Sequence, residues 1–95
     1  MHTDRPILLR EAIGETIRDL RLRSGRTLRD VSADAQVSLG YLSEIERGQK
    51  EASSEVLSSI ADAFMMSVGE LMVEVSARLM AYESDSVVSL TRMAA

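Results

Sequence analysis

The fold of this chain is decided by residues 27–48, which read TLRDVSADAQVSLGYLSEIERG. Thr27 stands three residues before Asp30, the spacing of a capping box, and this predicts the start of a helix. Ser38 is a favourable N-cap for a second helix, and Gly48 stands where that helix is expected to end. The stretch therefore predicts two short helices in close succession.

Two short helices joined by about three residues have helix-turn-helix geometry. Such a turn makes the second helix cross the first steeply and stand out from the body of the domain. A protruding helix, about 10–12 Å across, fits the major groove of B-form DNA. The pattern favours DNA binding by the helix that Ser38 begins, over the plainer interpretation of a solvated surface helix.

Helical periodicity continues on both sides of this motif and predicts an all-α fold. Apolar residues at spacings of three and four predict a helix over about 9–23, which Gly25 ends. Ser53 begins a fourth helix, and a capping-box match at 67–70 begins a fifth, which runs to about 82 or breaks near 74. The expected segments are a flexible N-terminus (1–8), a helix-turn-helix domain (9–72), a C-terminal helical dimerisation extension (73–83) and a flexible tail (84–95).

Composition excludes several classes of function. The chain has 95 residues, no Cys and one His, so disulfides, Cys-based zinc sites and His-rich metal sites are ruled out, and no cofactor is expected. No segment has the length of a membrane span. The formal net charge is −4, but residues 1–50 sum to +1 and residues 51–95 to −5. Any surface that binds DNA must therefore lie in the first half.

The sequence resembles the phage-repressor-like (Cro/C1, xenobiotic-response) helix-turn-helix family over roughly residues 11–72. Each matching piece is weak alone, but their order and spacing together are specific. This resemblance implies a five-helix repressor-like bundle that binds double-stranded DNA as a homodimer on a palindromic operator. The matching pieces are Ile13-Gly14, Ile17 to Arg21, Gly25 to Leu28, Val37-Ser38, Leu42 to Gly48, Leu57, Ile60-Ala61, Phe64, Val68 and Glu70-Leu71.

Residues 25–32 and 37–44 more specifically resemble actinobacterial regulators of Clp protease genes, which implies an activator of clp and other stress genes. Three positions depart from the family pattern, and one of them is Ser32, which replaces the usual small Ala of the second helix. Leu28 stands where the family often has a phosphate-contacting Gln, which puts that contact in doubt. Gln36 replaces the usual turn Gly and is expected to need a positive φ.

The resemblance implies two groups of DNA-binding residues. The first belongs to the third helix, where side chains reach base edges and the helix N-cap can touch phosphate. The second flanks the motif and meets backbone phosphate, although solvated surface charge is the alternative for each. The candidates are Ser38, Leu39, Gly40, Tyr41, Ser43 and Glu44 in the first group, and Thr27, Arg29, Arg47, Gln49 and Lys50 in the second.

Two further groups have structural roles. In the family, the residues matching Arg21 and Glu46 form a partly buried ion pair between the first and third helices. A late apolar stripe predicts a dimer interface, with docking on the protomer's own core as the alternative. The residues of this stripe are Leu71, Met72, Val75, Leu79, Met80 and Tyr82.

No carboxylate pair, phosphate-binding loop or nucleophile elbow occurs, so we do not expect an enzyme. Two other uses of the motif stay open, namely a protein-docking module and an antitoxin. Ala94-Ala95 resembles ends that Clp-type proteases engage, which makes such a protease a further expected partner. A cytoplasmic, nucleoid-associated regulator is the expectation that fits the sequence best.

Overall fold

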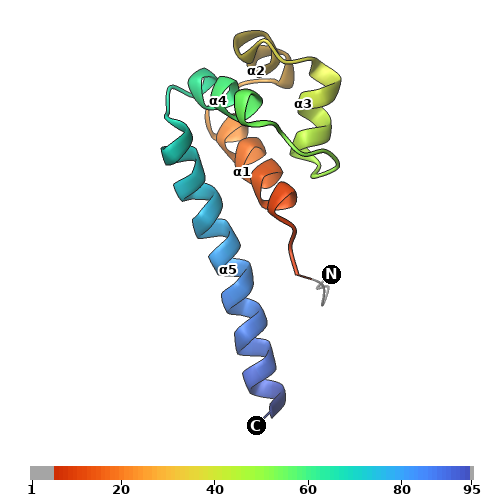
Figure 1. The fold of residues 1–95 in the computed structure, drawn as a ribbon, viewed down its shortest axis with the longest axis vertical. Coiled ribbons are helices and arrows are strands. Elements are labelled where there is room, and N and C mark those ends of the chain that lie inside the picture. Colours follow the sequence, from red (N-terminus) through yellow and green to blue (C-terminus); the bar gives the residue numbers. More distant parts are fainter. Residues whose placement is uncertain (1–5, 95) are drawn as a thin grey trace.

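The computed structural model describes residues 6–94, with side chains through Ser84. All regular structure in this part of the chain is helical, and Figure 1 shows four short helices gathered into a body from which a long fifth helix extends. The helices are α1 (Leu9–Arg23), α2 (Leu28–Ala35), α3 (Leu39–Glu46), α4 (Ser54–Ala63) and α5 (Val68–Ala94).

Local side-chain caps start four of these helices where the sequence predicts them. The Asp30 backbone N–H donates to Thr27 Oγ1 at 3.1 Å, and the Thr27 N–H donates to the Asp30 carboxylate at 2.9 Å. Ser38 and Ser53 accept from backbone N–H groups three residues on. Ser67 and the carboxylate three residues later repeat the reciprocal pattern at the start of α5. Each cap satisfies a donor that a helix start leaves unpaired.

A residue with left-handed backbone follows each of the first four helices. Gly25 and Gly48 have φ of 69° and 71°, a conformation that glycine adopts without steric cost. Gln36 closes α2 with φ 55°, as the sequence predicts for a residue in the place of a turn glycine. Met65 takes φ 59° between α4 and α5, which the sequence gives no sign of.

The core is aliphatic and is centred on α1, which packs against both α3 and α5. Because the chain has one Phe and no Trp, branched aliphatic side chains fill this space. No single described helix combines the length and apolar composition of a membrane span; α4 and the first part of α5 reach it only as a pair bent by 97°. The buried apolar residues are Ala12, Ile13, Ile17, Val31, Ala35, Leu42, Ile45, Ile60, Ala61, Leu71 and Val75.

Helix α5 is longer than the sequence predicts. It neither breaks near 74 nor ends near 82, and it includes residues 84–94 of the predicted flexible tail. The physical reason is that neither Gly nor Pro follows Gly69, so no helix-breaking residue interrupts the chain. Residues 1–5 of the predicted flexible N-terminus, Ala95 and the side chain of Ala94 lie outside the described part, so the proposed protease contact stays a prediction.

Candidate nucleic-acid interface

The first turn of α3 presents an exposed surface at the edge of the helix-turn-helix motif. Ser38, Leu39 and Gly40 are exposed, and Leu42 and Ile45 on the opposite side of the helix are fully buried. A Cβ at Gly40 would meet no atom within 4 Å, so the backbone at this position is open to close approach. The helix therefore presents its N-terminal end outward, and its positive dipole end favours an anion there.

Three other candidates on α3 are less available than the sequence predicts. Tyr41, Ser43 and Glu44, expected to be exposed, are half-buried. Tyr41 packs against the core, and its hydroxyl donates to the Glu51 carbonyl at 2.9 Å. These contacts arise because the segment after α3 folds back over the helix. Tyr41 consequently connects α3 to the loop before α4, and its contact with a base stays a prediction.

The polar residues after α3 form a connected group at its C-terminal end. Arg47 Nη1 donates to Ser43 Oγ at 2.9 Å, and its Nη2 donates to Gln49 Oε1 at 3.4 Å. Lys50 Nζ lies 3.7 Å from Glu44 Oε1. These side chains are therefore held near one another before any ligand binds, so less rotamer entropy is lost when they make contacts.

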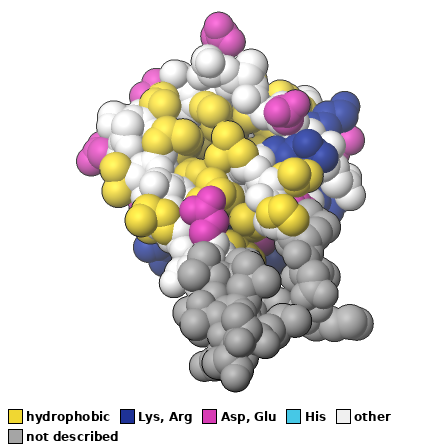
Figure 2. Space-filling view, turned by 60° about the horizontal axis from the view of Figure 1, so that its bottom comes forward, with side chains coloured by type: hydrophobic (Ala, Val, Ile, Leu, Met, Phe, Trp, Pro, Cys, Tyr) yellow, Lys and Arg dark blue, Asp and Glu magenta, His cyan; other side chains and the backbone are white. Residues whose placement is uncertain are grey.

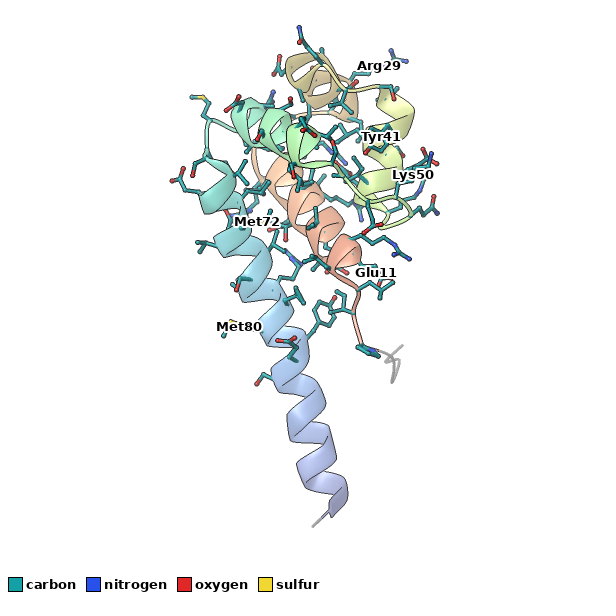
Figure 3. All side chains as sticks on the ribbon, in the orientation of Figure 1. Glu11, Arg29, Tyr41, Lys50, Met72 and Met80 are labelled. Atoms are coloured by element: carbon teal, nitrogen blue, oxygen red, sulfur yellow. The ribbon has the colours of Figure 1, made fainter. Side chains whose placement is uncertain are left out.

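Cationic side chains lie on both sides of the exposed end of α3. Thr27 and Arg29 are exposed at the start of α2, and within the described part of the chain no group pairs with Arg29. Figure 3 shows Arg29 and Lys50 on the α2–α3 side of the molecule, remote from α5. Hydrogen bonds from Thr27 also lower the pKa of Asp30, whose carboxylate lies at the N-terminus of α2. The cationic side chains, unlike this carboxylate, fit an elongated polyanion.

A buried ion pair joins α3 to α1. Arg21 Nε donates to Glu46 Oε2 at 2.8 Å, and Nη2 donates to Oε1 at 3.0 Å. Only 12% and 5% of the two side chains are exposed, and the bidentate contact raises the pKa of Arg21. The structure thus brings together the two residues that the family resemblance pairs. The contact fixes the direction of α3 relative to α1.

Gly14 permits the same two helices to approach closely. A Cβ at this position would lie 2.8 Å from the Glu46 carbonyl oxygen and closer still to that of Ile45. Both obstacles are backbone atoms, which cannot rotate away. Gly14 is therefore a requirement of the α1–α3 contact, and a Gly inside an otherwise regular apolar pattern was the available sequence signal.

Sequence reasoning missed Arg26, which holds the start of the motif. Its guanidinium donates to the Ala63 carbonyl at 2.6 Å, pairs with Asp34 and lies 5.4 Å from the Phe64 ring centroid. An Arg at the C-terminal end of α4 interacts favourably with the helix dipole and with the aromatic face. Only contacts between remote segments reveal this role.

The late apolar stripe divides between two faces of α5. Leu71 and Val75 are buried in the protomer's own core, and Met72 and Leu79 pack partly against it. The prediction of a dimer surface is corrected for Leu71 and Val75, because the protomer's own core buries them, and it stays a prediction for Met72 and Leu79. Figure 3 shows Met80 pointing away from the body, and 62% of this side chain is exposed.

The outer face of α5 also carries Val73, which the sequence analysis missed. Val73 is 69% exposed and lies seven residues before Met80, with the exposed Ala77 between them. Spacings of four and three place these residues on one stripe, opposite Leu71 and Val75. Apolar side chains also gather on the face shown in Figure 2, where acidic and basic groups border them. The molecule thus leaves part of its apolar surface uncovered.

A second, more open set of polar contacts joins α5 to α1. Arg78 donates to Thr16 Oγ1 at 3.2 Å and lies 3.3 Å from Glu15 and 3.5 Å from Asp19. The Tyr82 hydroxyl donates to Glu15 at 3.0 Å, and this bond raises the pKa of Tyr82. Tyr82 is thus directed toward α1, although 43% of it remains exposed.

The model of the helix-turn-helix domain family matches residues 12–74 of this chain. The chain is 50% identical over 72 residues to the "Transcriptional regulator ClgR" of two strains of Mycobacterium tuberculosis. That match covers 76% of this chain but only 64% of each relative's length. The "HTH-type transcriptional regulator DdrOP3" of Deinococcus deserti is 40% identical over 58 residues, which cover 61% of this chain and 45% of the relative.

Superposition on solved structures of other regulators shows the same fold. The clp gene regulator ClgR from Corynebacterium glutamicum superimposes with a TM-score of 0.82 at 38% identity, covering 92% of this chain and 93% of that one. The restriction-modification controller protein C.Esp1396I superimposes with a TM-score of 0.71 at 20% identity, covering 77% of this chain and 94% of that one. At that identity the second likeness shows the fold alone.

Proposed function

Because this chain belongs to the helix-turn-helix domain family, we propose that it is a sequence-specific DNA-binding transcription regulator that acts as a homodimer on clp genes. One observation carries the proposal. The exposed first turn of α3 lies between cationic groups on α2 and after α3, and a buried ion pair fixes α3 to α1. A rigid helix with cations at both ends matches the requirements of groove binding.

In this proposal α3 enters the major groove with its N-terminal end leading. Leu39, exposed at the tip, packs against a thymine methyl group, and Gly40 lets the backbone approach the base edges. Ser38 already caps the helix, so its hydroxyl oxygen is held where a phosphate would lie. Glu44 reads a base only if it first leaves Lys50, which makes it a secondary candidate.

The phosphate contacts come from Arg29 at one end and from Arg47, Gln49 and Lys50 at the other. These contacts contribute affinity and orientation without reading sequence. Each cation that meets a phosphate releases condensed counterions, so the affinity falls as the salt concentration rises. The acidic half of the chain, with α5, points away from the duplex and so avoids repulsion.

The homodimer forms, in this proposal, through the outer face of α5. Val73, Ala77 and Met80 supply an apolar stripe that the protomer does not cover, and small Ala77 allows a second helix to come close. Two copies related by a two-fold axis present their α3 helices to half-sites about 34 Å apart. Met80→Asp should shift the molar mass toward 10.4 kDa, whereas Ser54→Asp, which adds the same charge at the exposed first residue of α4, should leave the dimer intact.

The likeness to regulators named for clp genes supports the choice of target. We infer that the operators lie upstream of protease and stress genes in the bacterial nucleoid, where the protein activates transcription. The test is titration of a clp promoter duplex at several salt concentrations, with a scrambled duplex as the specificity control. Arg47→Ala should weaken binding to both duplexes and reduce the salt slope by about one.

Arg18→Ala is the matched control, because Arg18 is an exposed arginine in the middle of α1. It removes the same charge and should change the affinity by less than about twofold. Equal binding of the promoter and scrambled duplexes would contradict sequence-specific regulation. An unchanged salt slope for Arg47→Ala would contradict the phosphate contact.

A further inference from the structure

The backbone of the segment that follows α3 is restricted in conformation. The Gly48 N–H donates to the Ile45 carbonyl at 3.0 Å, and the Gln49 N–H donates to the Glu44 carbonyl at 2.9 Å. Gly48 itself has φ 71°, which strongly disfavours any other residue. The Gln49 N–H and the Gly48 carbonyl share one planar trans peptide unit, so the bond to Glu44 also directs the Gly48 carbonyl oxygen the opposite way, where it can accept from another group.

The first turn of α1 supplies that group. Arg10 Nε donates to the Gly48 carbonyl oxygen at 3.1 Å across 38 residues of sequence, and the bond is partly buried. Glu11 packs directly on Gly48, because a Cβ there would lie 2.9 Å from Glu11 Cγ and 3.1 Å from its Cα. Figure 3 shows Glu11 at the end of α1 that lies beside the segment after α3.

Arg10 occupies a place where a cation is unfavourable for the helix itself. It is the second residue of α1, and the positive end of the helix dipole disfavours a positive side chain in the first turn. The compensation visible in the structure is the bond to Gly48. Arg10 therefore destabilises the start of α1 slightly, and its bond to Gly48 orders the segment that follows α3.

We propose that Arg10 is a positioning residue for DNA binding: its Nε–H holds the Gly48 carbonyl and thereby places Arg47, Gln49 and Lys50 against the phosphate backbone. The proposal rests on the function proposed above and adds a residue from outside the helix-turn-helix motif. Arg10 acts through the hydrogen bond to Gly48, and its charge makes no contact with the duplex.

Two variants separate the hydrogen bond from the charge. Gln has the same number of side-chain atoms up to its amide nitrogen as Arg has up to Nε, so Arg10→Gln keeps a donor in that place without the charge. Arg10→Met keeps a similar stem and removes both. The comparison of Gln with Met therefore reports the hydrogen bond, and the comparison of Arg with Gln reports the charge.

The experiment measures promoter affinity, salt slope and amide hydrogen exchange for the full chain and both variants. Arg10→Gln should bind within about twofold of the unchanged protein, and Arg10→Met should bind about three- to tenfold more weakly, the value of one hydrogen bond. In the absence of DNA, Arg10→Met should also accelerate exchange at the Gly48 and Gln49 amides by a similar factor, whereas Arg10→Gln should not.

Equal losses of affinity in both variants, with a salt slope lower by about one, would overturn the proposal in favour of a direct phosphate contact. Unchanged affinity and exchange in Arg10→Met would overturn it as well. If the unchanged protein binds no promoter duplex, the proposed function fails, and the exchange comparison still decides whether Arg10 orders the segment.

Discussion

Helix α1 uses arginine–carboxylate contacts on two of its sides, and the two sides differ in burial. Toward α3, Arg21 and Glu46 meet through two bonds of 2.8 and 3.0 Å with 12% and 5% of the side chains exposed. Toward α5, Arg78 reaches Glu15 at 3.3 Å with 32% and 40% exposed. The same chemistry therefore makes a buried, rigid contact on the α3 side and an exposed, weaker one on the α5 side.

The two ion pairs differ in strength because water and salt reach the exposed pair and not the buried one. A buried pair is costly to form, but removal of one partner leaves an unpaired charge in the interior, which is strongly destabilising. An exposed pair competes with water and salt and contributes little. Helix α3 is thus held in one direction relative to α1, whereas α5 is held to α1 by weaker polar contacts.

The largest effect is expected when Glu46 is replaced by Ala. This change leaves the Arg21 guanidinium buried without its carboxylate, so the free energy of unfolding should fall by about 3–5 kcal/mol. Urea unfolding followed by circular dichroism measures this. Glu51→Ala, which removes an exposed carboxylate, is the matched control. If the two changes lowered the free energy of unfolding equally, burial of the ion pair would not explain the loss.

A slightly smaller effect is expected for Gly14→Ala. The added methyl group meets backbone oxygens of α3, so α3 must move away from α1 at a cost of about 2–3 kcal/mol. Gly40→Ala is the control, because open space surrounds Gly40 and Ala is the better helix former there, by about 1 kcal/mol. The two changes should shift the melting temperature in opposite directions; a shared direction would contradict the close α1–α3 contact.

These contacts show what could be predicted from the sequence. The caps at Thr27, Ser38 and Ser67 are local patterns of three-residue spacing, and the structure has all of them. The left-handed conformation of Gln36 could also be predicted, because it depends on a local pattern. Local chemistry decides such features, so one segment contains enough information.

The remaining features depend on which elements meet. Helix α5 carries two apolar stripes, and the sequence alone does not say that Leu71 is buried and Val73 is exposed. Tyr41 lies half-buried because a remote loop returns over it. The contacts of Arg10 and Arg78 join residues 38 and 62 positions apart, so a local pattern could not identify them.

A small effect is expected for Arg78→Ala. Its partners are partly exposed and lie at long distances, so the free energy of unfolding should change by about 0–1 kcal/mol, and less as salt increases. Thermal unfolding at low and high salt measures both quantities. A loss as large as that for Glu46→Ala would remove the distinction between the two sides of α1.

The smallest effect is expected from the titration of Tyr82. Because its bond to Glu15 raises the pKa of the phenol in the folded protein, this contact stabilises the fold fully below the unfolded pKa of about 10. Its contribution is lost as the pH rises through the higher folded value. Tyr82→Phe should therefore lower the melting temperature slightly at pH 8, and by less as the pH rises above about 10. A difference that stays constant as the pH rises would contradict the role of the bond to Glu15.

We expect DNA to meet the rigid α2–α3 side of the molecule and to make no contact with the outer face of α5. Titration of a clp promoter duplex into isotope-labelled protein, followed by amide chemical shifts, tests this most directly. The largest shifts should occur at Arg29, at residues 38–40 and at residues 47–50, with little change at Val73 and Met80. Shifts concentrated on the outer face of α5, with none at residues 38–40, would contradict it.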